Sequence, residues 1–214
     1  MNKLILIPIL LGVAAVASIS IFSISENTSQ APPQSKPIYE MGFTYYDVEK
    51  IKTSLAKQNI FMSAPTAITD HTIRQYCTFS DDENVQKTVV YCTTTAILDS
   101  DGEPLGNINM GGTTDGPIMA LAIIDASPFL DSREDEVNNV FQTMIETLVC
   151  DCWEDQQPGG FESVRAWLNT AEEKYVESSQ TTLKSKISGL EHKKLILEIT
   201  STDEFYLWTL IVIK

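Results

Sequence analysis

The stretch Phe205-Tyr206-Leu207-Trp208-Thr209-Leu210-Ile211-Val212-Ile213 is apolar or aromatic at nearly every position. Aromatic and β-branched side chains favour strands, and this run is apolar on both faces of a strand, whose side chains alternate. A strand of this composition that was left exposed would aggregate. We therefore expect residues 205–213 to lie in the interior of a sheet.

Two further strands are expected just before this stretch. In 183–187, leucine and isoleucine alternate with lysine, which predicts one buried face and one wet face. In 195–199, apolar residues again occupy alternate positions, and Gly189 and Asp203 mark the turns. Such short connections imply antiparallel pairing.

Four more strands are expected in the N-terminal half of the domain. The run 118–124 is almost continuously apolar, which suits a strand that is buried on both faces. The loop 80–84 separates the first two strands and predicts a hairpin, and Asp99-Ser100-Asp101-Gly102 predicts a turn before the third. The four expected strands are 71–79, 87–98, 105–110 and 118–124.

Three helices are expected from apolar residues that recur every three or four positions. They cover 45–58, where Thr44 and Asp47 resemble a capping box, then 132–149, and then a third that starts near Phe161 and extends to Tyr175. Acidic residues crowd the first turn of 132–149, where the helix dipole favours them. We expect an α+β fold, with a mainly antiparallel sheet and about three helices packed on it.

The N-terminus predicts export. After residues 1–3, a cytoplasmic stub with Lys3, the apolar run 4–24 has 21 residues, enough for a helix across a bilayer. The positive charge stays cytoplasmic, so the domain is placed outside. A cleavable signal peptide ending near Ala17 is the alternative. We favour a retained single-pass anchor in the cell membrane, because the apolar run continues well past Ala17.

Between this segment and the domain lies a predicted linker. Residues 25–37 are rich in Ser, Gln and Pro, a composition that cannot bury a core. Asn27 begins an Asn-Thr-Ser sequon, so it is a candidate glycosylation site. We expect one extracytoplasmic domain over residues 38–214.

The expected domain is strongly acidic. The chain has a net charge of −14, and the domain alone has 13 basic against 28 acidic residues, a net charge of −15. Such a surface repels nucleic acid. It suits an exterior domain, or one whose partner is a cation.

The four cysteines, Cys77, Cys92, Cys150 and Cys152, all lie in this domain. An even number of cysteines in an exported domain predicts disulfides, for which three pairings exist. A bond between Cys150 and Cys152 would need a small ring that helical geometry forbids. We therefore expect two disulfides that join the end of helix 132–149 to Cys77 and Cys92.

An alternative is a metal or thiol-redox site at Cys150 and Cys152, with Asp151 and Glu154 as further metal ligands. Two observations weigh against it: Cys-x-Cys is not the usual redox spacing, and acidic neighbours raise the pKa of a thiol. No catalytic motif or cofactor signature is present in the sequence. The leading hypothesis is therefore a non-catalytic interaction or accessory module of the cell envelope, bound to the membrane through 4–24 and to an envelope protein.

Overall fold

Residues 206–213 form strand β8 in the computed structural model of the protein, which describes residues 42–68, 72–73, 77–78, 83–178, 180–202 and 204–214. The predicted stub 1–3, membrane segment 4–24 and linker 25–37 lie outside the described residues. Within the described ranges, no helix combines the length and hydrophobicity needed to cross a bilayer.

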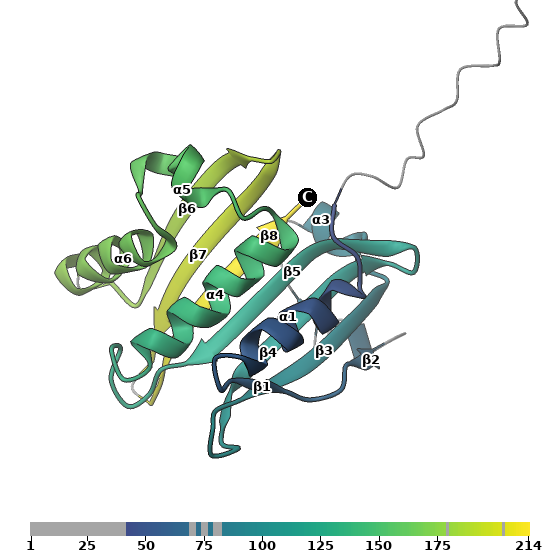
Figure 1. The fold of residues 1–214 in the computed structure, drawn as a ribbon, viewed down its shortest axis with the longest axis horizontal. Helices are drawn as coiled ribbons and strands as arrows, with labels where there is room; N and C mark the ends of the chain where they lie inside the picture. The colour runs from purple at the N-terminus through teal and green to yellow at the C-terminus, as the bar shows by residue number, and fades with distance from the viewer. Residues whose placement is uncertain (1–41, 69–71, 74–76, 79–82, 179, 203) are drawn as a thin grey trace, which may run out of the picture. The chain divides into compact units, whose positions relative to one another are not determined.

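Eight antiparallel strands form one sheet in the order β1-β3-β4-β5-β8-β7-β6, and β2 also pairs with β3 (Figure 1). Two meanders, β3-β4-β5 and β6-β7-β8, are joined where β8 pairs with β5. The strands are β1 Phe61–Met62, β2 Thr66–Ile68, β3 Tyr91–Leu98, β4 Pro104–Thr113, β5 Gly116–Asp125, β6 Thr182–Leu190, β7 Lys193–Ser201 and β8 Tyr206–Ile213.

Strand β8 lies in the sheet interior, as the sequence predicts, because it pairs with β5 on one edge and β7 on the other. Its residues Trp208, Leu210 and Val212 are buried in the main core. Strand β5 is covered on both faces, since Ala120 and Ala122 belong to the main core while Met119 and Leu121 belong to a second cluster. The sheet therefore has a core on each side along β5.

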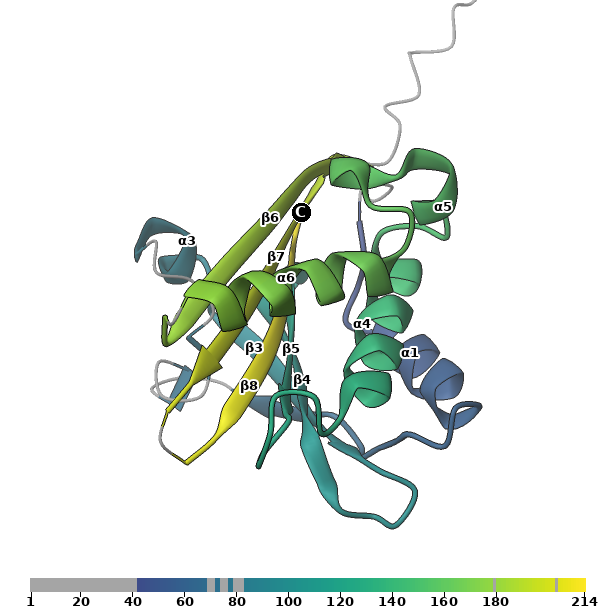
Figure 2. The same cartoon turned by 90° about the vertical axis from the view of Figure 1, so that its left-hand side faces the viewer.

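The three long helices pack on one face of the sheet, and α3 lies on the other side (Figures 1 and 2). Five α-helices occur among the described residues, two more than expected, and both extra ones are short. The α+β class and the antiparallel sheet are confirmed. The helices are α1 Asp47–Ala56, α3 Glu83–Lys87, α4 Glu134–Leu148, α5 Trp153–Gln156 and α6 Val164–Ser178, with a 3-10 turn η3 at Pro158–Gly160.

Helix α1 begins with the carboxylate contact that the sequence indicates. Asp47 Oδ2 accepts hydrogen bonds from Thr44 N at 2.6 Å and Thr44 Oγ1 at 3.0 Å, and Lys50 forms an ion pair with the same side chain. Burial alone would raise the pKa of Asp47, but the hydrogen bonds from Lys50 and Thr44 outweigh it and lower the pKa. The carboxylate thus stays charged at the helix N-terminus.

Helix α4 packs its apolar stripe over the seam between β5 and β8. The buried residues Val137, Phe141, Met144 and Leu148 recur every three or four positions, so they share one face of the helix. The opposite face is polar and includes Glu146. This helix begins and ends within two residues of the predicted limits, 132 and 149.

The expected strand at 71–79 is wrong in its described part. Thr72 and Ile73 are helical, and Cys77 N donates to the Ile73 carbonyl at 2.8 Å, a spacing of one helical turn. Glu83 and Asn84 of the expected loop belong to α3, and β3 begins only at Tyr91. The described residues therefore do not form the first predicted hairpin, and Ile73 and Val89 pack on the face of the sheet opposite α4.

Candidate functional site

The candidate site is built around Cys150 and Cys152, in the connection between α4 and α5. Helix α4 ends at Leu148, and Cys150 N donates to the Ile145 carbonyl at 3.1 Å. The chain then leaves helical geometry until α5 begins at Trp153. A disulfide joins the two cysteines, whose Cα atoms lie 5.2 Å apart.

This pairing corrects the prediction that Cys150 and Cys152 bond to Cys77 and Cys92. The prediction placed both cysteines by the helical period of α4, but they follow the end of the helix at Leu148, so helical geometry does not forbid a small ring. The sheet also separates the two pairs. Cys150 and Cys152 pack against the core beneath the helices, whereas Cys92 faces the second cluster on the other side.

The second disulfide joins Cys77 to Cys92, across a sequence separation of 15 residues. Both side chains are fully buried, at 0% exposure. The bond ties the helical segment before β3 to β3 itself. Such a buried bond, which closes a longer loop, is typical of a structural disulfide.

A cavity of about 290 Å³ opens beside the Cys150–Cys152 disulfide. Its walls come from α4, the connection, α5 and the start of α6. Both cysteines line it and are half-buried. Four carboxylates line it as well, and among the described residues of its wall none is basic; they are Glu146, Asp151, Glu154 and Asp155.

Two stacked tryptophans support this cavity from the core side. The rings of Trp153 and Trp167 lie 5.7 Å apart between centroids. Trp153 Nε1 donates to the Phe161 carbonyl at 3.1 Å, and Trp167 Nε1 donates to Ser185 Oγ at 2.8 Å. Because both rings are buried and their polar atoms are paired, the segment next to the disulfide is held in one position.

Gln156 contacts the disulfide directly. Its Nε2 donates to Cys152 Sγ at 3.2 Å and also lies 3.5 Å from Glu191 Oε1. Both neighbours are acceptors, so the side-chain amide must present its nitrogen to them. The sequence gives no signal for this contact, because Glu191 lies 35 residues further along the chain.

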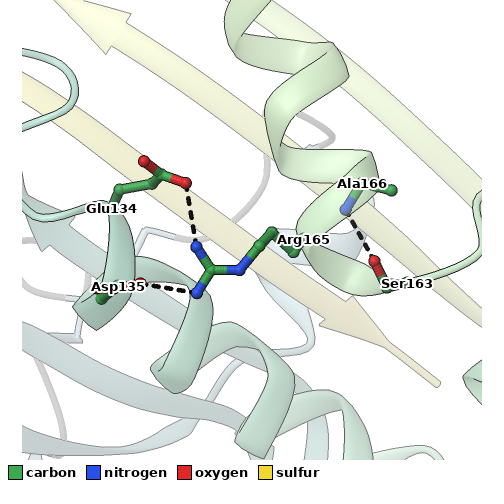
Figure 3. Close-up of polar contacts among 5 residues, drawn as sticks. All are labelled: Glu134, Asp135, Ser163, Arg165 and Ala166. Atoms are coloured by element: carbon green, nitrogen blue, oxygen red, sulfur yellow. Dashed lines mark hydrogen bonds and ion pairs between the residues drawn. The ribbon is translucent and has the colours of Figure 1, made fainter.

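Arg165 links α6 to α4 (Figure 3). From α6, its guanidinium donates to Glu134 Oε1 at 3.1 Å and to Asp135 Oδ1 at 2.7 Å, both in the first turn of α4. The hydrogen bond to Asp135 is the main cause that raises the pKa of Arg165. At the start of α6, Ser163 Oγ accepts a hydrogen bond from Ala166 N at 3.1 Å, a helix N-cap contact.

A second cavity, of about 440 Å³, lies between α4 and α6 and is also acidic. Glu134, Glu172, Glu173 and Glu177 line it. Burial is the main cause that raises the pKa of Glu172, and the charges of Glu134, Asp131 and Glu173 raise it further. Like charges are therefore concentrated on this side of the molecule.

Because its pKa is raised, Glu172 binds its proton more tightly in the folded than in the unfolded chain. The protonated side chain therefore favours the folded state, and this stabilisation is lost as pH rises through the raised pKa and the carboxyl becomes charged. Glu172→Gln should therefore increase the free energy of unfolding at pH 7 by about 0.2–1 kcal/mol. At about pH 3.5, below the ordinary pKa of a glutamate, the gain should vanish. Denaturant titrations at the two pH values test this, with Glu204→Gln as the control. A gain that was larger at low pH would contradict it.

The acidic charge of the domain is concentrated in the helical part of the chain. Residues 131–177 contain twelve carboxylates against Arg133, Arg165 and Lys174, a net charge of −9. Of these carboxylates, only Glu136 and Glu172 are not exposed. By contrast, residues 180–214 contain five lysines and four carboxylates, a net charge of +1. These two segments of the chain thus differ sharply in net charge.

The metal alternative receives no support from this arrangement. Cys150 and Cys152 are bonded to each other, so their thiolates are not free to bind an ion, and Asp151 and Glu154 are exposed. Across the part of the chain that the structure describes, no three His, Cys, Asp or Glu side chains are grouped as metal ligands. The candidate glycosylation site Asn27 lies outside that part.

Comparisons with protein-family models, with curated proteins and with solved structures find no match to this chain.

Proposed function

We propose that the chain is an exported, membrane-tethered, non-catalytic module of the cell envelope. We further propose that the acidic surface formed by residues 131–177, called the helical layer below, binds a basic partner protein. One observation carries this proposal: the net charge of −9 in residues 131–177, displayed by exposed carboxylates around two cavities. Charge of one sign in a concave surface attracts and orients an oppositely charged partner. The apolar run 4–24 supports the tether, and 25–37 supports a spacer between tether and domain.

The charge of the helical layer can be tested with two variants of equal net charge. The first combines Glu154→Gln, Asp155→Asn, Glu172→Gln and Glu173→Gln in the helical layer. The matched control changes four exposed carboxylates in hairpin turns of the sheet: Asp101→Asn, Glu103→Gln, Asp115→Asn and Glu204→Gln.

The first variant should bind an oligolysine peptide roughly tenfold more weakly than the unchanged protein, because four carboxylates that can each form a weak ion pair with a lysine are neutralised. The control should lose no more than about twofold, because its changes are remote. Titration calorimetry at low and high salt measures both. Equal losses in the two variants would show that only total charge matters and would refute the surface.

The same full-length variants identify the partner by affinity capture from the membrane of the source cell. A basic protein that is retained by the control and lost by the helical-layer variant is the partner that this surface binds. A partner lost equally from both would argue against the helical layer as the binding surface.

A second candidate function is thiol-redox chemistry at Cys150 and Cys152. The position of both sulfurs in the wall of a cavity favours it, because exposed disulfides are the ones that exchange.

A further inference from the structure

We propose that Cys150–Cys152 is an exchangeable disulfide that oxidises a dithiol carried by a neutral or cationic segment of a partner, with Cys150 as the sulfur that is attacked. This inference deepens the thiol-redox candidate and does not require that the helical layer bind a basic protein. It follows from three features of the site: access to the sulfurs, the contact with Gln156, and the surrounding carboxylates.

Access distinguishes the two disulfides of the chain. Cys77 and Cys92 are fully buried, whereas Cys150 and Cys152 line a cavity of about 290 Å³ and are half-buried. A thiolate can reach a disulfide only along the line of the sulfur–sulfur bond, so burial protects the first pair. The second pair also closes a ring with one intervening residue, which restrains the unfolded chain little.

The contact with Gln156 determines which of the two sulfurs is the leaving group in the exchange. Its Nε2 lies 3.2 Å from Cys152 Sγ and 3.5 Å from Glu191 Oε1, and two acceptors around the same nitrogen favour this orientation of the amide. When the bond breaks, negative charge develops on the leaving sulfur, and an N–H donor stabilises it there. Cys152 is therefore the leaving sulfur and Cys150 the sulfur that is attacked.

The exchange balances in two steps. A thiolate of the partner attacks Cys150 Sγ, the Cys150–Cys152 bond breaks, and its electron pair goes to Cys152 Sγ, which takes a proton from water. The partner's second thiol loses its proton to water and, as a thiolate, attacks the partner's sulfur in the mixed disulfide. The bond to Cys150 breaks, its electron pair goes to Cys150 Sγ, and Cys150 takes a proton from water. The partner gains a disulfide, and the chain gains two thiols.

The carboxylates select the partner by its charge. Glu146, Asp151, Glu154 and Asp155 surround the disulfide, so they repel an anionic attacker and favour one that carries positive charge. After reduction, the same carboxylates disfavour a thiolate on Cys150 or Cys152. The reduced pair is therefore poorly suited to act as the attacking dithiol.

The test measures how fast the full-length chain is reduced by three small thiols whose thiolate forms carry net charges of 0, −1 and −2. These are cysteamine, 2-mercaptoethanol and 2-mercaptoethanesulfonate, each normalised to its rate with a neutral small-molecule disulfide. Mass spectrometry after alkylation reports each cysteine separately, so Cys77–Cys92 is an internal control. If Cys77–Cys92 opens first, or if Cys150–Cys152 resists all three thiols, the thiol-redox candidate itself is refuted.

We expect Cys150–Cys152 to open first, with cysteamine favoured over the sulfonate by roughly tenfold at low salt, and with a smaller difference at 1 M salt. Glu154→Gln with Asp155→Asn should reduce that preference. If the disulfide opens readily without any dependence on charge, the cationic or neutral partner is refuted while exchange stands.

The role of Gln156 has a separate readout. Trapped mixed disulfides should carry the small thiol on Cys150 and the alkylating group on Cys152, and Gln156→Ala should slow their formation roughly three- to tenfold. Asn169→Ala, an exposed amide on α6 that lines the other cavity, is the control. Adducts mainly on Cys152, or equal rates in the two variants, would overturn the assignment of Cys150.

Discussion

Replacing Phe141 by alanine should lower the free energy of unfolding by about 3–5 kcal/mol, the range for a fully buried aromatic side chain. Phe141 is 0% exposed and lies on the buried stripe of α4, which packs over the seam between β5 and β8. The change would therefore leave a cavity where the two halves of the sheet meet. Urea titration, followed by circular dichroism, measures the loss.

Phe129→Ala is the matched control for this prediction, because it removes the same atoms from a side chain that is 68% exposed. It should change the free energy of unfolding by no more than about 0.5 kcal/mol. Similar losses in the two variants would show that α4 does not hold the core in this way.

Removing the Cys77–Cys92 disulfide by changing both residues to alanine should cost about 3 kcal/mol. The bond spans a sequence separation of 15 residues, and the entropy of closing a loop of that length in the unfolded chain has this magnitude. Alanine is preferred to serine because both positions are fully buried and a hydroxyl there would need a partner. The loss should appear as a lower denaturation midpoint.

The Cys150–Cys152 disulfide provides the comparison, since its sequence separation is only 2 residues. The same entropy relation gives about 1 kcal/mol for its removal. A larger loss for this pair than for Cys77–Cys92 would reverse the assignment of the two bonds, and would make Cys150–Cys152 the structural one.

Much of the sheet and the long helices could be predicted from the sequence because their patterns are local. The run 205–213 has no polar face, so it belongs inside a sheet, and β8 lies there. The stripe that includes Val137, Phe141 and Leu148 has the helical period, and α4 begins and ends close to its predicted limits. In both cases neighbouring residues in the chain contain the whole signal.

The predictions that failed concern features that depend on contacts between residues far apart in the sequence. The segment 71–79 has apolar residues at strand-like positions, but in its described part Thr72 and Ile73 are helical and Cys77 is buried in a disulfide. The cysteine pairing was predicted by applying the helical period to Cys152, although the chain has already left the helix at Leu148. Gln156 and Glu191 meet only because the β6–β7 turn approaches α5, which no local pattern records.

The position of β8 also has a consequence for the order in which the fold is completed. The last strand in the sequence fills the gap between β5 and β7, so contacts between residues about 90 positions apart hold the two meanders together. In a chain that emerges from its N-terminus, the edges of β5 and β7 stay unpaired until residue 213 has emerged. Until then the chain exposes two sheet edges that can pair with other chains.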